Sequence, residues 1–153
     1  MDNINKRDLL ISPIDNNIKL WNIKNWNWLL NIKNINIAGT LDSACFLNNN
    51  NQIYILTSNN NWNEDNLDCI KVYDFDGNKI KEINNSKDAV YFIDSYYDNK
   101  LFKNYIITGN NGYVKSYDYD NNELYHKYGD DKKNIFHNSL VITINEKNIN
   151  SIE

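Results

Sequence analysis

Proline, glycine, methionine and cysteine are scarce in this sequence, and it contains no long apolar run. The 153 residues include one Pro, five Gly, one Met and two Cys. No apolar stretch approaches the roughly 18 to 20 residues that span a bilayer, and the N-terminal MDNINKRDLLIS lacks the apolar core and cleavage site of a signal peptide. We therefore expect a cytoplasmic or nuclear protein with no membrane partner.

Metal-ligand patterns are missing too. The sequence has no CxxC motif, and its few thiols and imidazoles, Cys45, Cys69, His126 and His137, match no metal-ligand spacing. A Cys2His2 zinc site can be drawn from these four, but both cysteines lie in apolar runs, ACFL and CIKVY. Free cysteine in such a run usually behaves as a small buried hydrophobe. We expect no metal and no cofactor.

Charge of one sign does not dominate. The chain has 16 basic and 20 acidic residues, and its formal net charge is -4. The two signs are intermixed, so no basic field exists of the kind that neutralises phosphates. Nucleic acid is therefore not an expected partner.

Asparagine, isoleucine and lysine are abundant, with 33, 21 and 15 residues. Such an asparagine content is typical of disordered, prion-like tracts. The chain is nevertheless 41% hydrophobic and 13% aromatic, and its abundant Tyr and Ile favour strands. The length suits one ordinary domain. We expect a folded, strand-rich chain with asparagine in its turns and on its solvent faces.

One short segment occurs three times. The copies are IDNNIKLWNI, LDCIKVYDFDG and NNGYVKSYDYD. Each contains a branched residue, a lysine, one further residue, an aromatic residue and then Asn or Asp. The aromatic residues are Trp21, Tyr73 and Tyr117, at separations of 52 and 44 positions, and the residues after them are Asn22, Asp74 and Asp118. A fixed period of this size indicates a repeat architecture.

Short apolar runs surround each copy and predict strands. RDLLIS, NQIYILTS and KNYIITG precede the copies, NWLLNI, KIKEI and ELYHKY follow them, and SACFLN, AVYFID and SLVITIN open the next units. Asn-Gly and Asp-Gly pairs, at Asn111–Gly112 and Asp76–Gly77, and the segment Asp120–Asn122 are typical of hairpin turns. We expect about twelve antiparallel strands in meanders, without helices between the units.

This pattern resembles WD40 repeats, whose unit is a four-stranded propeller blade of about 40 to 45 residues. SPIDNNIKLWN is the closest match, with Asp15 six positions before Trp21. The departures are that no copy has a perfect Trp-Asp pair and that the family's Gly-His pair is absent. The resemblance implies an all-β, unclosed partial propeller of four-stranded antiparallel blades. Its parts are an incomplete blade at 1–35, blades at 36–85 and 86–132, and the start of a fourth at 133–153. The abundance of Asn, Ile and Lys is typical of an AT-rich genome, and we expect a eukaryotic one.

Propellers usually close with four to eight blades, so this arc does not close a standard ring alone. Three explanations remain: a slice of a longer propeller protein, a ring assembled from copies, or an unclosed arc. Open strand edges pair readily with other chains. We therefore expect self-association through the open blade edges.

The repeated side chains have structural and functional interpretations. The three aromatic residues at the repeat positions are expected to fill the space between blades, although a ligand-stacking ladder is the alternative. The lysines two positions before them are expected to be solvated. These lysines are Lys19, Lys71 and Lys115.

Two polar loops are candidates for partner contact. The first, Ser58–Asp68, lengthens one hairpin and carries Trp62, which either contacts a partner, packs back on the blade or has no role. The candidate partner-binding residues are Trp62, Glu64, Asp65, Asp130 and Asp131; the last two lie in GDDKKN, which is otherwise a solvated linker between blades. A third irregular segment, Ser95–Asn104, is expected to form a small satellite cluster on the opposite face.

Catalytic motifs do not occur in the sequence. It contains no GxSxG, glycine-rich phosphate loop or HExxH, and adjacent acids such as Glu64 and Asp65 give no evidence of opposed carboxylates. We expect a non-catalytic scaffold that binds protein or peptide partners. The alternative is a regulatory or substrate-recruiting propeller of a larger enzyme, such as a protein kinase or ubiquitin ligase; a trafficking or cytoskeletal subunit is a third.

Overall fold

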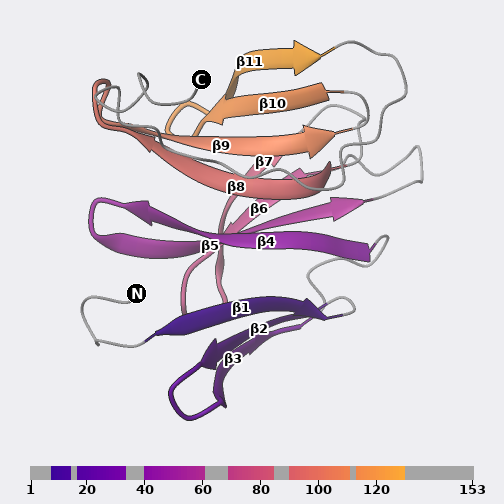
Figure 1. Cartoon of the computed structure of the whole chain (residues 1–153), viewed down its shortest axis with the longest axis vertical. Helices are drawn as coiled ribbons and strands as arrows, with labels where there is room; N and C mark the ends of the chain where they lie inside the picture. Colours follow the sequence, from indigo (N-terminus) through magenta and orange to yellow (C-terminus); the bar gives the residue numbers. More distant parts are fainter. Residues whose placement is uncertain are drawn as a thin grey trace, which may run out of the picture.

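The computed structural model describes residues 8–14, 17–33, 40–60, 69–84, 90–110 and 113–129. These residues form strands and turns, arranged as three antiparallel sheets that follow one another along the long axis of the molecule (Figure 1). The all-β expectation is confirmed. The described residues do not form a closed barrel, so the propeller remains a prediction.

Each sheet is a meander in which consecutive strands are neighbours. Sheet 1 consists of β1 (Leu9–Ile14), β2 (Asn17–Asn22) and β3 (Asn27–Ile32). Sheet 2 consists of β4 (Thr40–Asn49), β5 (Gln52–Asn60), β6 (Cys69–Tyr73) and β7 (Lys79–Asn84). Sheet 3 consists of β8 (Val90–Asp98), β9 (Lys103–Asn110), β10 (Tyr113–Asp118) and β11 (Glu123–Gly129).

These eleven strands coincide with the apolar runs that the sequence pattern marks as strands. The three sheets fall inside the ranges 1–35, 36–85 and 86–132, and their assignment as blades remains a prediction. The expected strand SLVITIN and the segment 133–153 lie outside the described residues.

Asparagine and glycine occupy turns in which the backbone is left-handed. Asn50 and Asn51 connect β4 to β5 with φ values of 51° and 64°, and Asn122 precedes β11 with a φ of 61°. Gly77 has a φ of 86° in the turn between β6 and β7. Positive φ is easiest for glycine and is tolerated by asparagine, so these turns account for part of the asparagine content. Asn111 and Gly112 lie outside the described residues.

The three repeated segments occupy equivalent strands, β2, β6 and β10, each followed by the outermost strand of its sheet. The preceding strands β1, β5 and β9 are therefore equivalent too. β1 contacts β4, as its equivalent β5 contacts β8. β4 and β8, the first strands of sheets 2 and 3, also contact each other. The same spatial step thus relates sheet 1 to sheet 2 and sheet 2 to sheet 3.

Two apolar cores lie between the sheets. The first joins Ile18 and Ile32 of sheet 1 to Ile55 and Tyr73 of sheet 2. The second joins sheets 2 and 3 and contains more buried side chains: Leu47, Leu56, Ile70, Val72, Ile83, Ile93, Ile106, Tyr117 and Tyr119. Alternation along each strand supplies both cores, because successive residues point to opposite faces of a sheet.

The expected satellite cluster at Ser95–Asn104 is wrong. Most of this segment is strand, because Tyr96 pairs with Tyr105 and Tyr97 with Asn104 in the β8–β9 ladder. The Asp98 carboxylate closes the short turn between them by accepting the Lys100 and Leu101 amides at 2.7 and 3.1 Å. Phe102, in this turn, is 78% exposed.

The expected solvation of the repeated lysines is wrong for Lys115. Its side chain is 3% exposed, and its Nζ lies 5.0 Å from the centre of the Tyr113 ring. Lys115 is two residues from Tyr117 and shares its face, which sheet 2 covers. Lys19 and Lys71 are half-buried.

Candidate functional site

The aromatic residue of each repeat faces away from the sheet that follows. Tyr73 lies in the core with sheet 1 and Tyr117 in the core with sheet 2, so each packs against the preceding sheet. For these two tyrosines, the expectation that the repeat aromatic residues fill the space between successive sheets is confirmed. Trp21 belongs to the first described sheet and is half-buried, and its Nε1 donates to Ser12 Oγ at 2.8 Å.

The residue after each aromatic closes the turn that follows. The Oδ1 atoms of Asn22, Asp74 and Asp118 accept the amide two positions ahead, at 3.0, 2.9 and 2.9 Å. Asx side chains make this bond readily and so stabilise turns. The three copies therefore share a geometry as well as a sequence pattern. Asp15, the remaining repeat position, lies outside the described residues.

Asp74 organises the β6–β7 turn. Its Oδ1 also accepts the Asn78 amide at 2.8 Å, and its Oδ2 accepts Asn78 Nδ2 at 3.0 Å. Burial raises the pKa of Asp74, but the hydrogen bonds from Asn78 and Asp76 outweigh it and hold the pKa below its ordinary value. The carboxylate is therefore a fixed anion at neutral pH.

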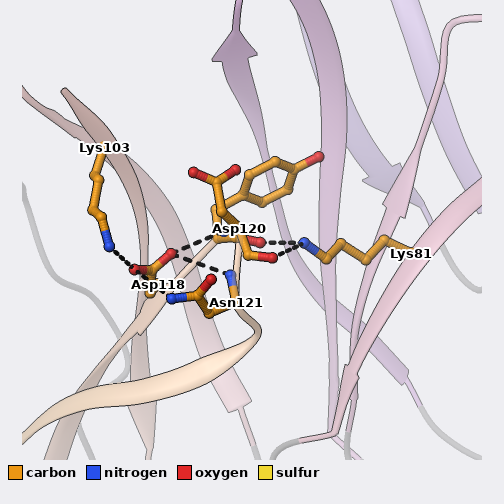
Figure 2. Close-up of polar contacts among 6 residues, drawn as sticks. Lys81, Lys103, Asp118, Asp120 and Asn121 are labelled. Atoms are coloured by element: carbon orange, nitrogen blue, oxygen red, sulfur yellow. Dashed lines mark hydrogen bonds and ion pairs between the residues drawn. The ribbon is translucent and has the colours of Figure 1, made fainter.

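Asp118 organises the corresponding turn of sheet 3, between β10 and β11 (Figure 2). Its Oδ2 receives Lys103 Nζ at 2.6 Å, and the Asn121 amide donates to Oδ1 at 3.3 Å. Burial raises the pKa of Asp118, but the Lys103 hydrogen bond and the Asn121 and Asp120 amides hold it below its ordinary value. The same bond raises the pKa of Lys103. Because both carboxylate oxygens are occupied, Asp118 is suited to holding a turn and poorly suited to accepting a proton.

Lys81 links this turn to the neighbouring sheet. From β7 its Nζ donates to the carbonyl oxygen of Tyr119 and, at 3.4 Å, to that of Asp120 (Figure 2). The Nζ lies 4.2 Å from the centre of the Tyr119 ring. Burial lowers the pKa of Lys81 and raises that of Tyr119. The polar residues in Figure 2 thus join sheets 2 and 3.

The predicted partner-binding residues are not brought together within the described residues. Trp62, Glu64, Asp65, Asp130 and Asp131 all lie outside the described ranges. The strands before them are described: β5 ends at Asn60 and β11 ends at Gly129.

These two strand ends lie at the same edge of their sheets. Ser95 Oγ donates to the Phe46 carbonyl at 2.7 Å, and the Ile93 amide donates to Ser43 Oγ at 3.3 Å. The contacts follow the same order along β4 and β8, so these strands run in the same direction. Since β5 is antiparallel to β4, and β11 to β8 through two intermediate strands, β5 and β11 end at a common edge.

Sequence reasoning missed two exposed apolar surfaces. On β11 the rings of Tyr125, His126 and Tyr128 form a row, with centroids 4.1 and 5.5 Å apart, and Tyr125 lies 4.8 Å from Tyr105. On sheet 1, the exposed side chains include Leu10, Ile14, Trp28 and Leu29. The available signal was that ELYHKY and NWLLNI carry large apolar residues at both odd and even positions, whereas a strand with one solvated face alternates.

Other chemical features of the described residues are few. No group of three or more His, Cys, Asp or Glu side chains in the described ranges is placed to hold a metal ion. Cys45 packs against the core between sheets 2 and 3, and burial raises the pKa of its thiol. His137 lies outside this part of the chain. None of the described segments is a helix with the length and apolar character to cross a membrane.

Comparison with known proteins adds no family assignment, because no family model and no curated protein matches the chain.

Proposed function

We propose that the chain is an arc of a WD40-like β-propeller and serves as a non-catalytic scaffold for protein or peptide partners. The observation that carries the proposal is the shared geometry of the repeats. In sheets 2 and 3 the aromatic residue packs on the preceding sheet, and in all three sheets the following Asx residue closes a turn. Radial repetition of four-stranded sheets is the architecture of a propeller.

The partner surface in this proposal is formed by the loops after β5 and β11. The support is that both strands end at one edge of the stacked sheets. In the sequence, the loop with Trp62, Glu64 and Asp65 follows the first strand end, and Asp130 and Asp131 follow the second. A tryptophan with acidic residues close to it in the sequence suits an anchor with a polar, acidic rim, since interface hot spots are rich in tryptophan. The proposal includes a cytoplasmic or nuclear location for this scaffold.

The test compares two tryptophans that differ in location. The full chain, Trp62→Ala and Trp26→Ala are used to capture proteins from an extract of the source organism, with quantitative mass spectrometry. Trp26 is a control because it is an exposed tryptophan in the β2–β3 turn. We expect Trp62→Ala to reduce a defined set of partners at least tenfold, which corresponds to about 1.4 kcal/mol, and to leave the thermal midpoint unchanged.

Two results would contradict this assignment. Equal partner sets for all three proteins would remove Trp62 from the binding surface. A large fall in the thermal midpoint of Trp62→Ala would instead mean that this side chain packs back on its own sheet.

A further inference from the structure

The two faces of each sheet have different roles in the stack. The face with the repeat aromatic packs on the preceding sheet, as Tyr73 and Tyr117 do. The opposite face packs on the following sheet, as Ile18 of sheet 1 and Val72 of sheet 2 do. We call these the leading face and the trailing face. Sheet 1 has a leading face, and sheet 3 has a trailing face, with no described sheet against it.

The leading face of sheet 1 carries exposed apolar side chains beside the polar residues Ser12, Lys19 and Asn31. Pairing in the ladder places Leu10 and Trp28 opposite Trp21, and alternation places Ile14 on the same face. Leu10, Ile14 and Trp28 are 44%, 39% and 59% exposed. The equivalent faces of sheets 2 and 3 are buried, with Tyr73 and Tyr117 at 6% and 4% exposure. An exposed apolar surface on several neighbouring strands marks an interaction site.

The trailing face of sheet 3 also carries apolar side chains, beside the polar residues Ser116 and His126. In the β9–β10–β11 ladders, Val114 lies opposite Tyr128, and Ser116 lies opposite both Ile107 and His126. These residues alternate with Tyr117, so they point away from sheet 2. Ile107 and Val114 are half-buried, and Tyr128 is exposed. Val114 occupies the position of Ile18 and Ile70, which are fully buried in the two cores.

We infer that the leading face of sheet 1 docks the trailing face of sheet 3 of a second copy of this chain. The occupant follows from continuity with the two interfaces inside the chain, where the same pair of faces meets twice in succession. Docking a second copy would form the same contact between a leading face and a trailing face a third time. The two faces differ, so the contact is heterologous, and it generates either a ring or an open series of copies. The inference rests on the proposed propeller arc. It makes packing between sheet faces, and not pairing between strand edges, the main contact between copies.

The test uses one variant on each face. Trp28→Lys puts a charge on the leading face and Tyr128→Asp puts one on the trailing face. Phe102→Asp, at an exposed position in the turn between β8 and β9, is the control. The mass of each full-length protein is followed by sedimentation at concentrations of about 1 to 100 μM, where weak interfaces become populated. We expect the wild type and Phe102→Asp to self-associate and each face variant to remain a monomer. Leu10→Lys is a second leading-face variant in case Trp28→Lys does not fold.

Mixing the two face variants gives the decisive result. Trp28→Lys keeps an intact trailing face and Tyr128→Asp keeps an intact leading face, so a heterologous contact predicts that the mixture forms a one-to-one dimer. A monomeric wild type, a mixture that stays monomeric, or face variants that associate like the wild type would each overturn the inference. If the self-association test fails but Trp28→Lys still captures the Trp62-dependent partners, the proposed scaffold function stands. Loss of those partners only in Trp62→Ala tests the scaffold separately.

Discussion

The interface between sheets 1 and 2 and the interface between sheets 2 and 3 use one repeat but differ in chemistry. In sheets 1 and 2, the residue just before the repeat aromatic pairs with a residue on the last strand of the sheet. Leu20 pairs with Leu30 in sheet 1, and Val72 pairs with Lys81 in sheet 2. Leu30 packs in the apolar core with Phe75 nearby, whereas Lys81 donates hydrogen bonds to the carbonyl oxygens of the next sheet. The arrangement of successive sheets is therefore set by the backbone and the repeat aromatic residue. The position of Leu30 or Lys81 accepts either an apolar or a charged side chain.

The interfaces also differ in how completely they are buried. Ile32 and Leu30 approach the turn at Gly77, where a Cβ would lie 3.6 Å from Ile32 Cγ1 and 3.8 Å from Leu30 Cδ1. The side chains around this contact, including Ile11, Leu30 and Phe75, are only partly buried. Between sheets 2 and 3, most of the apolar core is fully buried. Sheet 1 is thus attached by less buried surface, and regions with fewer buried apolar contacts open first.

The largest expected effect on stability comes from replacing a buried isoleucine by alanine, and the same change can be made at each interface. Ile106 lies between sheets 2 and 3, Ile18 lies between sheets 1 and 2, and both are fully buried. Ile106→Ala should lower the free energy of unfolding by about 2 to 5 kcal/mol, because it removes buried methyl groups and leaves a cavity. Denaturant titration measures this loss.

Ile18→Ala should release sheet 1 while sheets 2 and 3 stay folded. We expect amide hydrogen exchange in β1–β3 to accelerate at least tenfold, with exchange in β9 unchanged. Equal acceleration in all three sheets would mean that the two interfaces open together and that the difference in burial has no energetic consequence.

A smaller effect concerns the polar turn of the second interface. Asp118→Asn keeps an oxygen for the turn amides but removes the charge that Lys103 contacts, so we expect a loss of about 1 to 3 kcal/mol at pH 7. The folded-state pKa of Asp118 is lowered. Its contribution is therefore present above the unfolded pKa of about 3.9 and is lost as the pH falls through the lower folded value.

The difference in stability between wild type and Asp118→Asn should accordingly narrow in acid below about pH 4. Asp76→Asn, an exposed carboxylate in the equivalent turn of sheet 2, is the matched control. A gap that stays constant from pH 7 to the acid limit would show that the ionised carboxylate does not stabilise the turn.

Much of the fold could be predicted from local pattern. Short apolar runs and Asn or Gly turns located the described strands, because strand pairing within each meander joins segments that are near in sequence. The position of Tyr73 and Tyr117 between sheets followed from their bulk and their fixed place in the repeat. Lys115 was misjudged because its burial depends on sheet 2, which covers it, and a lone lysine in a strand does not reveal a covering sheet.

The candidate site was harder to predict for the same reason. The exposure of Trp28 and Tyr128 depends on which sheet faces have a neighbour, and neighbours are set by tertiary order. The Lys81 contact with the Tyr119 carbonyl joins residues 38 positions apart, which local patterns do not reveal. Trp62 and the acids around it remain a prediction from sequence.

The packing of Tyr73 and Tyr117 on the sheet before their own can be measured by nuclear Overhauser contacts between their rings and assigned methyl groups. We expect contacts from the Tyr73 ring to Ile18 or Ile32 of sheet 1, and from the Tyr117 ring to Leu56, Ile70 or Val72 of sheet 2. Contacts from these rings only to methyl groups within their own sheets, or from Tyr73 to methyl groups of sheet 3, would contradict it.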